Sequence, residues 1–174
     1  MIANKNYPGG FTLIELIVTI AIIGIISTFA LADYRNASNS TVLHLETQKL
    51  VGDIRRAQNM ALGAVDNDGA TPSGGWGIHI ASAGAYYIFA DNDADGRYTG
   101  SDAIAQTAPL SSLVEFSAGV GVSIVYLPPD PTVKIYSGGP AFDPDVTITL
   151  RQVNNPGSSR NIILNDFGLV DSSE

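Results

Sequence analysis

The chain has 174 residues, with 17 acidic residues against 9 lysines and arginines, and it has no cysteine. Its formal net charge of −8 is uneven, because residues 64–174 carry thirteen acids and four basic residues, a net of −9, whereas residues 1–63 carry four acids and five basic residues. An acidic domain repels phosphate backbones, so nucleic acid is a poor partner, and the lack of cysteine excludes disulfides, thiol catalysis and thiolate metal sites.

Residues 11–32 form an apolar run that begins directly after the pair Gly9-Gly10. The run contains no Lys, Arg, Asp, Asn, Gln or Pro, and its only charged residue is Glu15. A helix of this length spans roughly 33 Å, about the thickness of one bilayer core. A carboxylate in such a segment costs about 2.5 kcal/mol or more in lipid. We therefore expect Glu15 to have a role that outweighs this cost.

Three other interpretations of the apolar run fit the sequence less well. A cleaved secretory signal has a basic segment, an apolar core of about 7–15 residues and a small-residue cleavage site after that core. Here the small residues come first and the apolar run is longer. A plain membrane anchor would explain the length but not Glu15. A buried core helix would show a polar face, and none is present before Asp33.

A second helical segment continues from the apolar run without a proline or a paired glycine up to Leu62. Its apolar residues recur at helical spacing and form one stripe, which comprises Leu43, Leu50, Ile54, Ala57 and Ala61. The opposite face is predicted to carry Glu46, Lys49, Asp53 and Arg56. This pattern predicts one continuous helix over residues 12–63, whose second half packs its stripe on the chain's own sheet.

Short runs with β propensity follow a connection that is rich in Gly, Pro, Asp and Asn. Several alternate apolar and polar residues, as half-buried antiparallel strands do. The predicted strands are 76–81, 86–90, 113–117, 120–127, 132–136, 146–150 and 161–164. A tight turn is predicted at Asn165-Asp166-Phe167-Gly168. The fold class is therefore α+β, with a long N-terminal helix, membrane-spanning and then amphipathic, packed on one face of a small antiparallel β domain.

An acidic segment at residues 91–102 fits the ligand spacing of a calcium loop, D-x-D-x-D-G followed by five residues and an acid. The oxygens would come from Asp91, Asp93, Asp95, the Arg97 carbonyl, Thr99 through water, and Asp102. The twelfth position is Asp rather than the usual Glu, and the flanking residues predict strands rather than helices. The alternative is a solvated hairpin loop with Asx turns and no ion. Calcium is the one cofactor that the sequence suggests.

No catalytic arrangement is found along the sequence. The two histidines, His44 and His79, have no second metal ligand at a recognisable spacing. There is no Ser-His-Asp order and no glycine loop of the kind that holds phosphates. We therefore expect a structural protein and not an enzyme.

The run Gly10-Phe11-Thr12-Leu13-Ile14-Glu15 resembles the processing site of type IV prepilins and type II secretion pseudopilins. The whole chain resembles minor pseudopilins and minor pilins of the GspH/FimT type, in which a long helix supports a small β domain. The C-terminal part of this resemblance consists of Gly75-Trp76-Gly77, Phe89-Ala90-Asp91 with Asp95-Gly96, and Arg160-Asn161-Ile162-Ile163 with Phe167-Gly168.

The resemblance implies a division of the chain into four parts. Residues 1–10 would be a leader peptide, and residues 11–32 a transmembrane helix that becomes the filament core. Residues 33–64 would continue as an amphipathic helix into the β domain of residues 65–174. Prepilin peptidase would cut between Gly10 and Phe11 and methylate the new Phe11 amine. Main structural pilins usually have a kinking proline where this chain has Ala32, which favours a minor role.

The resemblance also implies how the subunit assembles. The Phe11 ammonium would be neutralised by Glu15 of a neighbouring subunit, which fixes the axial register. The expected location is the bacterial inner membrane, crossed once, with the C-terminal domain in the periplasm, followed by the filament. The expected partners are prepilin peptidase, other pilin or pseudopilin subunits and the inner-membrane assembly platform. An alternative is a minor pilin that binds DNA or a surface ligand in DNA uptake or adhesion.

Overall fold

The computed structural model describes residues 10–128, 132–139, 141–168 and 170–173, and within the helix it leaves out the side chains of residues 30–37. Most of the predicted leader and the last residues of the predicted span 11–32 therefore lie outside the described residues or side chains. The chain divides into two units, Met1–Ser38 and Asn39–Glu174.

Helix α1 comprises Leu13–Leu62, so the predicted continuous helix is confirmed to within one residue at each end. It begins at Thr12, whose Oγ1 accepts a hydrogen bond from the Glu15 backbone N–H at 3.3 Å, as an N-cap residue does. Every described side chain from Phe11 to Phe29 is exposed. Among the described residues, no helix combines the length and the apolar character needed to cross a membrane.

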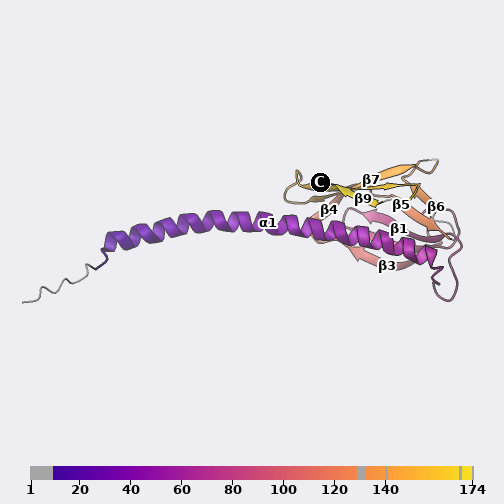
Figure 1. Cartoon of the computed structure of the whole chain (residues 1–174), viewed down its shortest axis with the longest axis horizontal. Coiled ribbons are helices and arrows are strands. Elements are labelled where there is room, and N and C mark those ends of the chain that lie inside the picture. Colours follow the sequence, from indigo (N-terminus) through magenta and orange to yellow (C-terminus); the bar gives the residue numbers. More distant parts are fainter. Residues whose placement is uncertain (1–9, 129–131, 140, 169, 174) are drawn as a thin grey trace, which may run out of the picture. The chain divides into compact units, whose positions relative to one another are not determined.

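In the described residues of the second unit, the C-terminal half of α1 is followed by nine strands (Figure 1). These are β1 (Gly75–Ser82), β2 (Ala85–Asp91), β3 (Ala103–Pro109), β4 (Val114–Ala118), β5 (Ser123–Leu127), β6 (Thr132–Tyr136), β7 (Asp145–Gln152), β8 (Ser159–Asn165) and β9 (Val170–Ser173). They form two antiparallel sheets, with strand orders β3-β2-β1-β5-β6 and β4-β7-β8-β9. The α+β fold class is confirmed, whereas the prediction of a single sheet is wrong.

The chain passes from β4 of one sheet to β5 of the other through Gly119-Val120-Gly121, of which Val120 and Gly121 were predicted to belong to a strand. Both glycines have positive φ, 95° at Gly119 and 88° at Gly121. A Cβ on Gly119 would lie 3.0 Å from Cγ1 of Ile148, so a side chain has little room there. These residues turn the chain, and β5 consequently begins only at Ser123.

The predicted apolar stripe of α1 forms the centre of the core. Leu43, Leu50, Ile54, Ala57 and Ala61 are at most 2% exposed. They share one core cluster with residues of both sheets, among them Ile78, Ile88, Ile124, Ile148 and Ile162. Thr47 completes the stripe, because its hydroxyl donates to the Leu43 carbonyl at 2.8 Å and is thereby satisfied within the helix.

The charged residues of α1 do not lie opposite this stripe, which corrects the prediction. Their polar atoms bind β2, β3 and the segment after β3. The pairs are Glu46 Oε1 with the Ser111 N–H (3.0 Å), Lys49 Nζ with the Pro109 carbonyl (3.1 Å), Asp53 Oδ2 with the Tyr86 hydroxyl (2.6 Å) and Arg56 Nη1 with Gln106 Oε1 (2.7 Å). At about 100° per residue these positions flank the stripe on one side. They therefore form a polar seam between the helix and the sheet.

The hydroxyl of Tyr126 on β5 is buried in the core and has no hydrogen-bond partner among the described residues. Burial raises the pKa of the Tyr126 phenol. The pKa of the Tyr86 phenol is also raised, by burial and by its hydrogen bond to Asp53. A phenol that stays protonated in the fold contributes stability that is present below about pH 10 and declines as the pH rises further, because the unfolded chain then loses the proton more readily.

We expect Tyr126→Phe to raise the free energy of unfolding by about 1 kcal/mol at pH 7, since it removes a buried polar group without a partner. Above pH 10 the variant should also lose stability less steeply than the parent. Urea unfolding at pH 7 and at pH 10.5 measures both effects. Tyr87→Phe, at a half-buried position on β2, is the control and should change neither. Destabilisation at pH 7 would show that the hydroxyl is satisfied after all.

Candidate functional site

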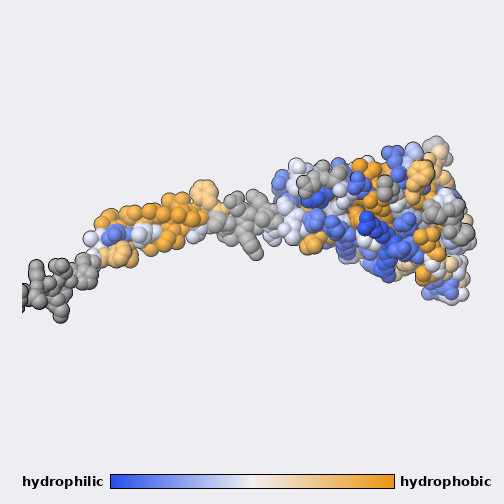
Figure 2. Space-filling model, in the orientation of Figure 1, coloured by the Kyte–Doolittle hydropathy of each residue, from blue (hydrophilic) through white to orange (hydrophobic). Residues whose placement is uncertain are grey.

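The first candidate site is the exposed start of α1. Phe11 is 79% exposed, and the apolar side chains that follow cover the helix surface (Figure 2). The hydroxyls in this segment bind carbonyls of their own helix: Thr19 to Leu16 (2.8 Å), Ser27 to Ile23 (2.7 Å) and Thr28 to Ile25 (2.6 Å). Their polar atoms are therefore satisfied internally, which leaves the surface effectively apolar.

Glu15 differs from the other polar residues of residues 11–29. Its backbone N–H is capped by Thr12, but no described basic residue forms an ion pair with its carboxylate. A carboxylate in the first turn interacts favourably with the helix dipole. That effect is small for an exposed group, about 0.3–1 kcal/mol, and any acid in that turn would provide it. Capping therefore explains the helix start without requiring an acid in an otherwise apolar run.

The second candidate site is the acidic segment 91–102, which joins β2 to β3. The structure brings together three of its predicted ligands, Asp91, Asp93 and Asp95, each of which offers an oxygen within 4.8 Å of the other two. Asp91 is 1% exposed and ends a strand, whereas Asp93 is exposed. Burial raises the pKa of Asp91, and a hydrogen bond from Ser101 lowers that of Asp93.

The other predicted ligands lie differently from the calcium-loop pattern. Asp102 accepts hydrogen bonds from the backbone N–H groups of Asn92 (2.9 Å) and Thr99 (2.7 Å), so its carboxylate closes the loop. The Thr99 hydroxyl donates to Asp93 Oδ2 at 3.2 Å. The Arg97 guanidinium forms an ion pair with Asp95 at 3.0 Å and lies 4.9 Å from the ring centre of Tyr136.

Tyr98, which the sequence did not single out, fixes this segment to the sheet. Its ring stacks on His79 of β1 at 4.8 Å and meets Tyr87 and Phe89 of β2 edge-on at 5.6 and 5.3 Å. Its backbone N–H donates to Ser123 Oγ, which also contacts His79 Nδ1 at 2.9 Å. His79 is half-buried on β1 and packs through these contacts, and its burial lowers the pKa of the imidazole.

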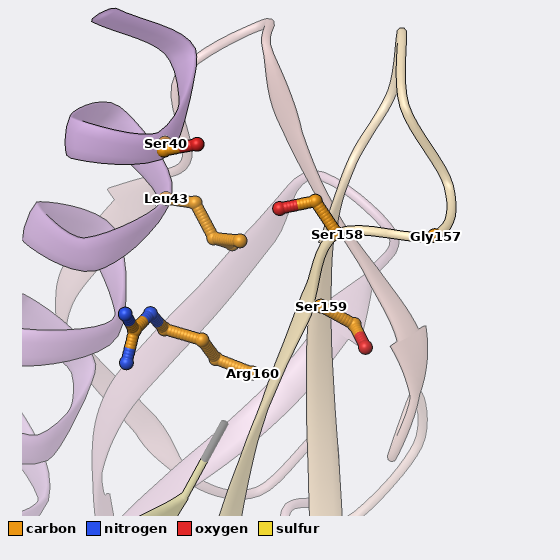
Figure 3. Close-up of a pocket in the computed structure, with 6 residues that line it drawn as sticks. All are labelled: Ser40, Leu43, Gly157, Ser158, Ser159 and Arg160. Carbon is orange, nitrogen blue, oxygen red and sulfur yellow. The ribbon is translucent and has the colours of Figure 1, made fainter. Parts of the chain in front are cut away.

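A third feature is a polar depression of about 430 Å³ between the middle of α1 and the start of β8 (Figure 3). Its lining residues are Ser40, Leu43, Gly157, Ser158, Ser159 and Arg160. The Gln152 amide donates to Ser40 Oγ at 3.3 Å and to Ser158 Oγ at 3.1 Å. Because these hydroxyls already serve the contact between helix and strand, the depression belongs to the packing of the domain.

Comparison with known proteins matches only the first of these sites. Residues 5–31 match the family described as the prokaryotic N-terminal methylation motif. No curated protein and no solved structure matches the chain. The matched residues include Gly10, Phe11 and Glu15, and the motif implies processing by prepilin peptidase and assembly with other pilin subunits. This motif, at the start of a helix that packs on an antiparallel β domain, indicates a prepilin-type, type IV pilin-like protein.

Proposed function

We propose that the chain is a minor pilin or pseudopilin, a non-catalytic subunit of a filament of a type II secretion system or a type IV pilus. The observation that carries this proposal is the apolar surface of α1. From Leu13 to Phe29 the large apolar side chains point in all directions around the helix and are 48–76% exposed. Burying such a surface against other helices is strongly favourable.

The start of the helix supplies the register of this assembly. Cleavage before Phe11 creates an α-ammonium at the edge of an apolar surface, where an isolated cation is costly. Glu15 offers the matching carboxylate, and it has no ion-pair partner among the described residues of its own chain. Only a subunit that is added at the correct axial position would bring the two charges together.

The same surface suits the unassembled subunit to a membrane. We propose that residues 11–32 hold it in the inner membrane by a single pass, with the β domain on the periplasmic side, until the assembly platform transfers it to the filament. The GspH/FimT type is the subfamily that the small β domain supports best. Ala32 in place of a kinking proline favours a minor subunit.

DNA binding is the weaker alternative. The β domain has a net charge of −9, and its basic side chains are largely engaged. Arg151 forms an ion pair with Glu115 at 2.7 Å, Arg97 pairs with Asp95, and Lys134 lies over the ring of Phe142. A phosphate backbone needs a stripe of accessible positive charge. Adhesion to another surface ligand has no feature of the described residues in its favour.

Mass spectrometry of the chain recovered from a filament fraction tests the proposal. The mature protein should begin at Phe11 with a methylated amine, and it should be found in filaments sheared or extracted from cells. A variant with Gly10→Val, which places a branched side chain at the cleaved bond, should remain uncleaved and absent from filaments. A mature chain that starts at Met1, or absence of the processed chain from every filament fraction, would contradict the proposal.

A further inference from the structure

The acidic segment contains a buried oxygen that its fold does not explain. Asp91 is 1% exposed, and its Oδ2 accepts the Gly96 N–H at 2.9 Å. Its Oδ1 is buried and has no hydrogen-bond partner among the described residues. The carboxylate is also held in place, because a Cβ on Gly74 would lie 2.2 Å from Asp91 Cγ. A buried carboxylate oxygen without a partner is costly unless something positive compensates for it.

Asx turns account for the other two aspartates but not for Asp91. Asp93 Oδ1 accepts the Asp95 N–H at 3.3 Å, and Asp95 Oδ1 accepts the Arg97 N–H at 2.9 Å. These bonds are those of an ordinary acidic turn. They place two further carboxylates next to Asp91, which adds repulsion. Among the described residues, the one ion pair of these three aspartates is that of Arg97 with Asp95, and it leaves Asp91 and Asp93 without a basic partner.

We infer that Asp91, Asp93 and Asp95 form a calcium site, with Asp102 closing the loop rather than binding the ion. Oxygens within 4.8 Å of one another can contact one ion at the usual calcium–oxygen distance of about 2.4 Å. Calcium takes about six to eight oxygens in flexible arrangements, which water and the hydroxyls beside Asp93 can complete. Those hydroxyls belong to Thr99 and Ser101, both of which donate to Asp93 Oδ2.

The contacts of the segment show what the ion would stabilise. Gly96 packs against Lys134 and Phe142, since a Cβ there would lie 2.4 Å and 2.9 Å from their side chains. Tyr98 covers the outer face of the sheet, where Phe89 is completely buried. A calcium ion therefore joins the end of β2 to a loop that protects β1, β2 and β5, and its binding stabilises the β domain whether or not the subunit assembles.

Thermal unfolding of the full chain in detergent tests the site. Calcium at a hundredfold excess over its dissociation constant should raise the melting temperature by about 5–10 °C relative to chelator. Isothermal titration should give one calcium per chain, and magnesium, which prefers rigid octahedral sites, should stabilise far less. No shift with calcium, or an equal shift with magnesium, would overturn the assignment.

Two variants and a control distinguish the aspartates that bind the ion from Asp102, which closes the loop. Asp93→Asn with Asp95→Asn keeps the shape and should abolish the calcium shift. Asp102→Asn should melt earlier in chelator, because one of its two N–H contacts loses its acceptor, and should keep the shift. Asp145→Asn, at an exposed position on β7, should behave like the parent. Loss of the shift in Asp102→Asn together with its retention in the double variant would overturn the proposed ligand set.

Discussion

Replacing Glu15 by glutamine or alanine should leave cleavage and methylation intact and should reduce incorporation into filaments by roughly 100-fold or more. In the assembled state the Phe11 ammonium of a neighbour would lose its partner. Breaking a buried ion pair costs about 3–5 kcal/mol, because the remaining charge stays uncompensated, and each 1.4 kcal/mol corresponds to a factor of about ten. In the lone helix the substitution removes only an exposed carboxylate, so the subunit itself should fold normally.

The measurement is a competition in cells that express the parent and the variant with different tags, read out in isolated filaments. Thr19→Val is a matched control on the same exposed helix, because the Thr19 hydroxyl donates to the Leu16 carbonyl of its own helix at 2.8 Å. It should assemble like the parent. Equal amounts of the Glu15 variant and the parent in filaments would contradict the registry role. Failure of the variant to be cleaved would assign Glu15 to processing instead.

The helix could be predicted well because its signals are local. Thr12 caps the start, the spacing of Leu43, Leu50 and Ile54 repeats with the helical period, and no proline interrupts the chain. The polar seam was placed on the wrong face for a physical reason. Glu46 and Asp53 bind a backbone N–H and a tyrosine hydroxyl far away in sequence, and helical periodicity contains no information about such partners.

Strands whose apolar and polar residues alternate could be predicted from the sequence. A strand without this alternation was missed. The strand β3 contains four small or polar residues among Ala103–Thr107 and lies at a sheet edge, so β propensity is weak there. One of the passages between the two sheets, from β4 to β5, uses the positive φ of Gly119 and Gly121. Glycine at these positions was visible in the sequence, but its conformation was not.

The start of α1 and the acidic segment 91–102 also differ in how far the sequence alone could predict them. Gly10, Phe11 and Glu15 belong to one continuous stretch of six residues, which can be read directly from the sequence and lies within the matched residues 5–31. In the acidic segment the spacing pointed to Asp91, Asp93, Asp95 and Asp102 alike. The fold separates Asp102 from the other three by giving it two backbone N–H groups, and it buries one oxygen of Asp91. Burial and backbone geometry are properties of the folded chain, which ligand spacing alone does not specify.

Leu50→Ala should be the most damaging single truncation of the α1 stripe, with a loss of about 2–5 kcal/mol in the free energy of unfolding of the β domain. Leu50 is completely buried at the centre of the stripe, in the core cluster that unites α1 with both sheets. Its removal leaves a cavity that residues of the helix and of two sheets would all have to shift to fill. Such sites relax little, so the cost lies well above that of losing the apolar contact alone.

The chain offers both a probe and a control for this experiment. Trp76 is its only tryptophan, is 2% exposed, and donates its indole N–H to the Val65 carbonyl at 2.9 Å, so its fluorescence reports unfolding of the domain in urea. Leu45→Ala removes the same atoms from the same helix at a position that is 60% exposed, and it should change stability by about 0.5 kcal/mol or less. Equal losses in the two variants would mean that α1 does not pack its stripe against the sheets in solution. A large loss in Leu50→Ala alone, with cleavage before Phe11 unchanged, would establish that the second half of the helix holds the domain together independently of processing at its start.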